Sequence, residues 1–301
     1  IGFNKLIARF SDEEASRLAM LQRGEADIIW GLSPDFVEVA ESAGMKVSSV
    51  NTQAPSYVAL HSLPEENPVD PGTPNPLRDI RVRRAMNYMI DRDAILGTLL
   101  RGHGFPMQSW IPKPDMMGYV DPSELEQFNY NPDKARALMA EAGYPNGFKN
   151  RIRHRAKGWI KGMEIGAAVC DQLAEFGIET EQDALASAVW VQSLFGKKTA
   201  PTHLELGWPA PTDPWLLPRG GLQFFQWIDD PEMVKIYDNT FQFTAADQHR
   251  ELQKLNKHFW NSAHCIWLWH PAAIWGVQPD ITWEASGLYY GADFHGARFT
   301  P

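Results

Sequence analysis

An aromatic segment between Leu206 and Trp227 carries residue types suited to binding a small molecule. It combines flat rings with one acid and one base: Trp208, Asp213, Trp215, Arg219, Phe224, Phe225 and Trp227. Aromatic faces stack on planar groups, while a carboxylate and a guanidinium orient a polar ligand. The segment is rich in Pro and Gly and follows a predicted strand, where α/β proteins bind ligands. We therefore predict a ligand surface here, with a satellite hydrophobic cluster as the alternative.

His264, Cys265 and His270 are the residues nearest to a metal-binding pattern. On one extended strand the two histidines would share a face, but they would lie about 20 Å apart, beyond the reach of one ion. Cys265 would face the opposite side and is predicted to lie in the core. Cys170 is the second cysteine, and the sequence leaves open whether the two pair.

Catalytic signatures are missing from the sequence, which has no GxSxG, GxxxxGK[ST], HExxH or EF-hand motif. Asp213 with His203, or Cys265 with His264, are the pairs that an enzyme could use. We predict no catalytic residue, no metal and no cofactor.

Composition favours a folded, acidic protein. Its 301 residues are 44% hydrophobic and 22% charged, and 28 basic against 37 acidic side chains give a net charge of −9. An acidic balance disfavours a nucleic-acid partner. No run approaches the roughly 18 apolar residues of a membrane span, so no membrane insertion is expected.

The first part of the chain is predicted to alternate strands and helices. We expect strands at residues 1–9, 26–30 and 45–50 and helices after Ser11 and at residues 34–43. Ser11 with Glu14 reads as a capping box. The proline-rich stretch at residues 63–79 follows and is predicted to be the loop into a second domain.

The second part again mixes helices and strands, so the predicted class is α/β. Asp91 and Asn131 are expected to cap helices, the latter with Pro132 in the first turn. Pro271 is expected to end the strand that starts at Cys265. The basic run at residues 151–162 is predicted to be a charged, solvated sheet edge.

Several motifs in a fixed order resemble one family. They are LAMLQRGEADIIWGLSPDFVEVAE, NPLRDIRVRRAMNYMIDRDAIL, RGHGFP, IPKPDMMGY, YNPDKARALMAEAGYPNGF and LGW followed by TDPW. Together they are similar to the solute-binding proteins of peptide, oligopeptide and nickel ABC importers, and the resemblance spans nearly the whole chain.

The resemblance implies a two-lobed, periplasmic-binding-protein-like α/β fold of type II that lacks the N-terminal part of the family. Residues 1–62 would be the remainder of lobe I, residues 63–280 lobe II, and residues 281–301 the return to lobe I. It also implies an ABC importer component, periplasmic or lipid-anchored outside the cell, that captures a small solute and delivers it to a permease. Peptide-like compounds, sugars and metal chelates are the expected solutes. A protein–protein adaptor using the aromatic segment, or an enzyme on the same scaffold, are the alternatives.

The resemblance also suggests which residues contact the solute. Gly207 and Trp208 match a Gly-Trp pair after which peptide-binding members place an aspartate, but here only the later Asp213 is available. That departure puts a peptide ligand in doubt. Trp110, His103 and Trp190 fall in segments that resemble cleft-lining ones.

Overall fold

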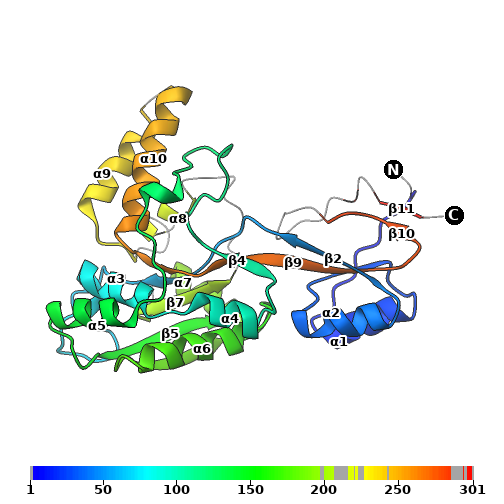
Figure 1. The fold of residues 1–301 in the computed structure, drawn as a ribbon, viewed down its shortest axis with the longest axis horizontal. Coiled ribbons are helices and arrows are strands. Elements are labelled where there is room, and N and C mark those ends of the chain that lie inside the picture. Colours follow the sequence, from blue (N-terminus) through cyan, green and yellow to red (C-terminus); the bar gives the residue numbers. More distant parts are fainter. Residues whose placement is uncertain are drawn as a thin grey trace.

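A computed structural model shows two α/β bodies side by side (Figure 1). It describes residues 3–196, 200–206, 216–219, 221–222, 227–242, 244–285, 294 and 297–299. The larger body holds the middle of the chain, and the smaller body combines both ends of the described chain.

A five-stranded sheet is the centre of the larger body, in the order β6-β5-β7-β3-β8. Its strands are β3 (Ser56–Leu60), β5 (Lys149–Arg155), β6 (Glu179–Leu185), β7 (Thr202–Leu206) and β8 (Cys265–Trp267). β5 runs parallel to β6 and β7, whereas β3 runs antiparallel to β7 and β8. β3 and β7 are buried along their whole length, as expected for strands covered on both faces.

Helices cover this sheet and extend beyond it. They are α3 (Ile80–Tyr88), α4 (Arg92–Thr98), α5 (Pro132–Glu141), α6 (Gly162–Ala174), α7 (Ser187–Phe195), α8 (Leu216–Arg219), α9 (Pro231–Asn239) and α10 (Ala245–Asn261), with short 3-10 turns η1 (Pro76–Arg78) and η2 (Pro122–Glu124). α6 and α7 lie on opposite faces of the sheet. Successive side chains of β5 point to opposite faces, and two neighbouring ones contact different sides. His154 is hydrogen-bonded to Gln182 on the face covered by α6, while Arg155 lies over the ring of Trp190 in α7. α9 and α10 project away from the sheet (Figure 1).

The smaller body is a helix-covered sheet built around the long strand β9 (Trp269–Val277). β1 (Ile28–Trp30) and β2 (Lys46–Asn51) flank β9, both antiparallel. The remaining elements are α1 (Glu14–Gln22), α2 (Pro34–Ser42), β10 (Ile281–Thr282) and β11 (Arg298–Phe299). Alternation along β9 places Ile274 with the helices and Trp275 with Trp283 on the other face.

β9 belongs to both bodies. Its first residues pair with β4 (Gly104–Pro106) of the larger body, and the rest pair with β1 and β2. The chain crosses between the bodies once more between β2 and β3. Thus Ser56–Leu60, which the sequence placed before the lobe crossing, lies in the larger sheet. Hydropathy identifies a strand but not the sheet that the strand joins.

The N-terminal predictions were partly wrong. Residues 3–10 form no strand, and α1 begins at Glu14 without a side-chain cap. The Glu14 carboxylate instead accepts a hydrogen bond from the backbone N–H of Ser33, the residue before α2. A contact between two helix starts replaces the expected local capping box. The caps at Asp91 and Asn131 are confirmed, with bonds from the backbone N–H groups of Ala94 and Lys134.

Two strand predictions were also wrong. β9 continues through Pro271, because the segment after β2 bonds to the carbonyl oxygen of Pro271 and requires no N–H group from it. Pro271 O accepts hydrogen bonds from Thr52 N at 3.0 Å and Thr52 Oγ1 at 2.7 Å. Residues 151–155 of the basic run lie in β5, which is inside the sheet and not at its edge. Its charges are matched by β6, where Glu181 pairs with Arg151 at 2.7 Å.

Candidate functional site

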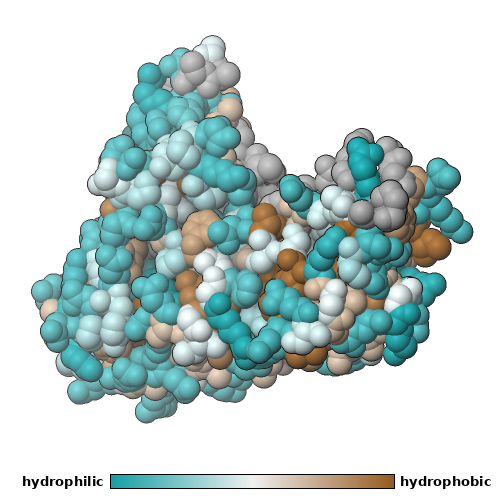
Figure 2. All heavy atoms as spheres, turned by 45° about the vertical axis from the view of Figure 1, so that its right-hand side comes forward, coloured by the Kyte–Doolittle hydropathy of each residue, from teal (hydrophilic) through white to brown (hydrophobic). Residues whose placement is uncertain are grey.

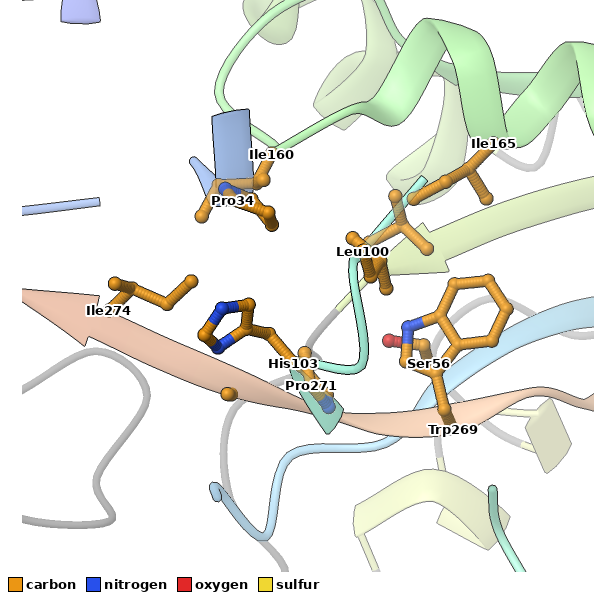
Figure 3. Close-up of a pocket in the computed structure, with 11 residues that line it drawn as sticks. Pro34, Ser56, Leu100, His103, Ile160, Ile165, Trp269, Pro271 and Ile274 are labelled. Carbon is orange, nitrogen blue, oxygen red and sulfur yellow. The ribbon is translucent and has the colours of Figure 1, made fainter. Parts of the chain in front are cut away.

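A hollow lies where the two bodies meet (Figure 3). Its enclosed part is small, about 20 Å³, and it continues into an open depression, so the space outside the protein atoms totals about 360 Å³ with open solvent included. Its lining is mostly apolar and comes from both bodies: Pro34, Ser56, Leu100, His103, Ile160, Ile165, Leu206, Trp269, Pro271, Ala272 and Ile274. The space-filling view shows hydrophobic side chains reaching the surface in the middle of the molecule (Figure 2).

The small-body wall comes from α2 and β9. Pro34 is the first residue of α2, where its missing N–H costs no helical hydrogen bond. Ile274 and Ala272 project from β9 on the same face as the helices, and Leu32 N–H donates to Ile274 O at 3.1 Å. This bond fixes the segment before α2 against the sheet and so holds Pro34 at the hollow.

The larger body supplies a tight turn after α4. Gly102 N–H donates to Leu96 O at 2.9 Å, and His103 N–H donates to Leu100 O at 2.8 Å. The turn carries both Leu100 and His103 into the hollow (Figure 3). His103 Nδ1 lies 2.9 Å from Ser49 Oγ of β2, so this side chain also bridges the bodies. Partial burial lowers the pKa of His103, which favours the neutral ring.

The start of α6 forms the opposite edge. Ile160 and Ile165 enclose one turn, which is closed by Ile165 N–H donating to Lys161 O at 2.8 Å. In Figure 3, Ile160 and Pro34 lie together at one end of the hollow, with Trp269 and Ser56 at the other. A solute in the hollow would therefore contact segments that are far apart in the chain.

Ion pairs join the bodies beside the hollow. The carboxylate of Asp35 in α2 contacts Lys161 Nζ and lies 3.2 Å from Arg101 Nη2. The hydrogen bond from Lys161 lowers the pKa of Asp35, with Arg101 adding to the effect. A more exposed pair, Glu13 with Lys157 at 3.5 Å, also spans the bodies.

Most of the predicted aromatic segment lies outside the described residues, namely Gly207, Trp208, Asp213, Trp215, Phe224 and Phe225. Arg219 is exposed at the end of α8. His103 lines the hollow. Trp110, Trp190 and Trp227 are 1%, 1% and 0% exposed and belong to the core of the larger body.

Trp190 and Trp227 come together around His203 of β7. Their ring centroids lie 6.4 and 5.1 Å from that of His203, both edge-on. His203 Nδ1 lies 2.7 Å from His61 Nε2. Burial lowers the pKa of His203 to about 3 and that of His61 well below its ordinary value, so both rings are neutral at pH 7.

Arg155 and Glu205 are polar residues of this cluster that the sequence analysis did not select. The Arg155 guanidinium carbon lies 4.9 Å from the ring centre of Trp190 and 5.5 Å from that of Trp159. Burial raises the pKa of Glu205 to about 8, opposed by the charge of Arg155. Within the described chain, Glu205 Oε1 has no hydrogen-bond partner. Arg155 was not selected because it is one of several basic residues in the run at 151–162. Glu205 was not selected because a single Glu in a predicted strand indicates no particular function.

The histidines of the suspected metal pattern have separate structural roles. His264 Nε2 lies 3.0 Å from Asp230 Oδ2, which also contacts His258, while His270 Nδ1 lies 3.2 Å from Ala54 O. Among the described residues, no group of three His, Cys, Asp or Glu side chains could hold a metal ion. Cys170 and Cys265 are both free thiols.

The comparisons with known proteins identify the family. The model for "bacterial extracellular solute-binding proteins, family 5 Middle" matches residues 2–221. The chain belongs to the family 5 solute-binding proteins. The resemblance inferred from the motifs is thereby confirmed.

Two curated relatives of the family 5 chain carry the names of binding proteins. The dipeptide-binding protein of Escherichia coli (strain K12) is 41% identical over 144 residues, covering 48% of this chain and 24% of the relative. Heme-binding protein A of Haemophilus influenzae is 32% identical over 149 residues, also 48% of this chain and 24% of the relative.

Solved structures confirm the predicted α/β fold of two-lobed binding proteins. NikA from Brucella suis, in complex with Fe(III)-EDTA, has a TM-score of 0.78 and 15% identity. The match covers 96% of the family 5 chain and 60% of NikA, so the chain spans less than two thirds of that protein. Within the part that the structure describes, no helix is both long and apolar enough to cross a membrane.

Proposed function

We propose that the chain is part of the substrate-binding component of an ABC importer, which captures a small solute between two lobes and delivers it to a membrane permease. The observation that carries this proposal is the apolar hollow with walls from both bodies. A solute that contacts both walls binds the closed arrangement more tightly and shifts the equilibrium toward it. The permease could then distinguish loaded from empty protein by shape.

The two bodies correspond in this proposal to the two lobes. Lobe I is close to residues 1–62 and 281–301 and lobe II to residues 63–280, except that β3 lies in the larger body and the end of β9 in the smaller one. The sheets support two crossings, one between β2 and β3 and one within β9. Because two chain segments connect the bodies, the bodies can move relative to each other only by bending and twisting of these two segments.

The chemistry of the lining favours a small, partly apolar solute. Its aliphatic and aromatic side chains bury apolar surface, and the ring of His103 offers a polar contact. Although the aspartate expected after Gly207 and Trp208 is displaced to Asp213, the named relatives lead us to propose a peptide-like compound first, with a sugar or a metal chelate as the other classes. Support comes from the named relatives, which bind dipeptide and heme, and from the chelate complex of NikA.

The proposed binding residues include those of the aromatic segment. β7 ends at Leu206, which lines the hollow, and Gly207 and Trp208 are the next residues in the sequence. Asp213, Trp215, Arg219, Phe224 and Phe225 complete that segment. His103 would act from the turn after α4, whereas Trp110, Trp190 and Trp227, at most 1% exposed, would support the wall from the core without touching the solute.

The proposal places the protein outside the cytoplasm, in the periplasm or lipid-anchored, and assigns it no catalytic activity. The family description names extracellular proteins, and the named relatives are binding proteins. A permease is the proposed protein partner. The residues that line the hollow favour neither the adaptor nor the enzyme alternative.

Native mass spectrometry of the protein purified from its own cells tests the proposal. We expect a non-covalent adduct of small mass that disappears on denaturation and that, when added back, raises the melting temperature. Dipeptides, heme and Fe(III)-EDTA serve as added probes. The proposal is wrong if no adduct is found and none of these probes changes the melting temperature, or if an added solute is chemically converted.

A further inference from the structure

One acidic side chain of the smaller body is shared by two cations of the larger body. Asp35 contacts Lys161 Nζ through one carboxylate oxygen and lies 3.2 Å from Arg101 Nη2 through the other. Lys161 is also 3.8 Å from Glu164 in its own helix, so Asp35 makes the closer contact. Three charged residues from α2, the turn after α4 and the start of α6 therefore meet at one point.

Each of these residues is next in sequence to a residue that lines the hollow. Asp35 follows Pro34, Arg101 follows Leu100, and Lys161 follows Ile160. Figure 3 shows Pro34 and Ile160 together at one end of the hollow. Moving the bodies apart at this end would separate the ion pairs and widen the hollow in the same motion.

The backbone holds both cations in an uncommon conformation. Arg101 has φ of 48° and Lys161 has φ of 56°, in the left-handed region that costs a non-glycine residue about 1 kcal/mol or more. Ala263 is the third described non-glycine residue with positive φ. These turns fix the direction in which each side chain leaves the backbone, and both side chains reach Asp35.

We propose that Asp35, Arg101 and Lys161 form an electrostatic latch that favours the closed arrangement of the two bodies and slows solute release. The side chains of Lys161, Asp35 and Arg101 are 20%, 41% and 53% exposed, so each pair contributes modestly. Loss of the latch should raise the ratio of open to closed molecules about two- to fivefold. The part of the proposal that concerns solute release rests on the proposed function. The equilibrium between open and closed arrangements can be measured on the chain without any solute.

Distances between the bodies test the latch without any solute. Spin labels on Glu38→Cys in α2 and Glu175→Cys after α6, both exposed positions, report the separation in a Cys170→Ser background. Asp35→Asn should increase the population at long distance. Glu13→Gln is the matched control, because it removes an interbody pair that is more exposed and whose residues do not line the hollow, and it should leave the distances unchanged.

A second variant and salt complete the test. Lys161→Met should open the chain as Asp35→Asn does, and the double variant should add little, because both remove the same contact. High salt should open the unmodified chain but barely change Asp35→Asn. The latch is wrong if both folded single variants keep the distance distribution of the unmodified chain.

The solute measurement separates the latch from the proposed function. In the protein from its own cells, Asp35→Asn should release the co-purified solute about two- to fivefold faster. If no solute binds but Asp35→Asn opens the chain, the proposed function fails and the latch stands. If a solute binds and the variants do not change opening, the latch fails and the proposed function stands.

Discussion

His203 Nδ1 lies 2.7 Å from His61 Nε2 in a fully buried contact between β7 and the end of β3. Two charged imidazoles could not remain at this distance. Since both rings are held neutral by burial, the pair links the stability of the larger body to pH.

Acidification should therefore destabilise the chain well above pH 4. Burial lowers the pKa of His203 to about 3 and those of His264 and His270 to about 4, against about 6.5 when unfolded. Below pH 6.5 the unfolded state binds more protons, so stability falls as pH falls, by about 1.4 kcal/mol per unit for each ring. The raised pKa values of His258 and Glu205 act in the opposite direction, because these two groups bind more protons in the folded state than in the unfolded state.

Urea unfolding at pH 7 and pH 5 would measure this loss. The variant His203→Gln, which cannot gain a proton, should reduce the difference between the two pH values. An equal free energy of unfolding at both pH values would show that these rings are not neutral in the folded chain.

Removing the buried guanidinium of Arg92 should destabilise the larger body. Its Nη1 donates to the carbonyl oxygens of Asn87, Ile90 and Phe128 at 3.0, 3.0 and 2.8 Å. Arg92→Met would leave these acceptors without a donor, and we expect a loss of about 3 kcal/mol in chemical denaturation. Arg250→Met, at an exposed surface pair, is the control and should cost less than about 1 kcal/mol.

Filling the hollow should block solute binding without unfolding the chain. Ile160 is half-buried at the hollow, so Ile160→Trp should place an indole in the space and weaken binding of the co-purified solute at least about tenfold by calorimetry. Val234→Trp, at an exposed position of α9, should bind normally. Normal binding by Ile160→Trp would place the solute elsewhere.

Trp208 is predicted to be a central contact of the solute. Trp208→Ala should weaken binding by about 2–4 kcal/mol while leaving the melting temperature of the free protein nearly unchanged. A buried tryptophan behaves differently: Trp190→Ala should lower the free energy of unfolding by about 3–5 kcal/mol. Calorimetry and denaturation together separate the two roles, and unchanged affinity for Trp208→Ala would remove it from the site.

Local features of the fold could be predicted from the sequence. Asn131 and Asp91 cap helices because the capping side chain and the N–H that it accepts from are only three residues apart. Glu14 fits the same pattern but bonds to Ser33, since a partner brought close by folding competes with the local one. Arg151 can lie in an interior strand because Glu181 of the neighbouring strand pairs with it. The spacing of residues within one segment cannot predict such a partner.

The candidate site, too, could be predicted from the sequence only in part. His103 was selected through family resemblance, and the structure places it at the hollow. Asp35, Ile160 and Ile274 were not selected, because each looks ordinary in its own segment. Their proximity arises only when β9 returns to the first part of the chain, and hydrophobic periodicity contains no information about such a long-range contact.

The strand order of the smaller body also sets the time at which it can be completed during synthesis. β1 and β2 each pair with β9, which lies between them, although β9 leaves the ribosome more than two hundred residues later. Until then, the apolar faces of α1 and α2 have no finished sheet to cover. The sheet around β9 can therefore be completed only after residues 269–277 have been synthesised.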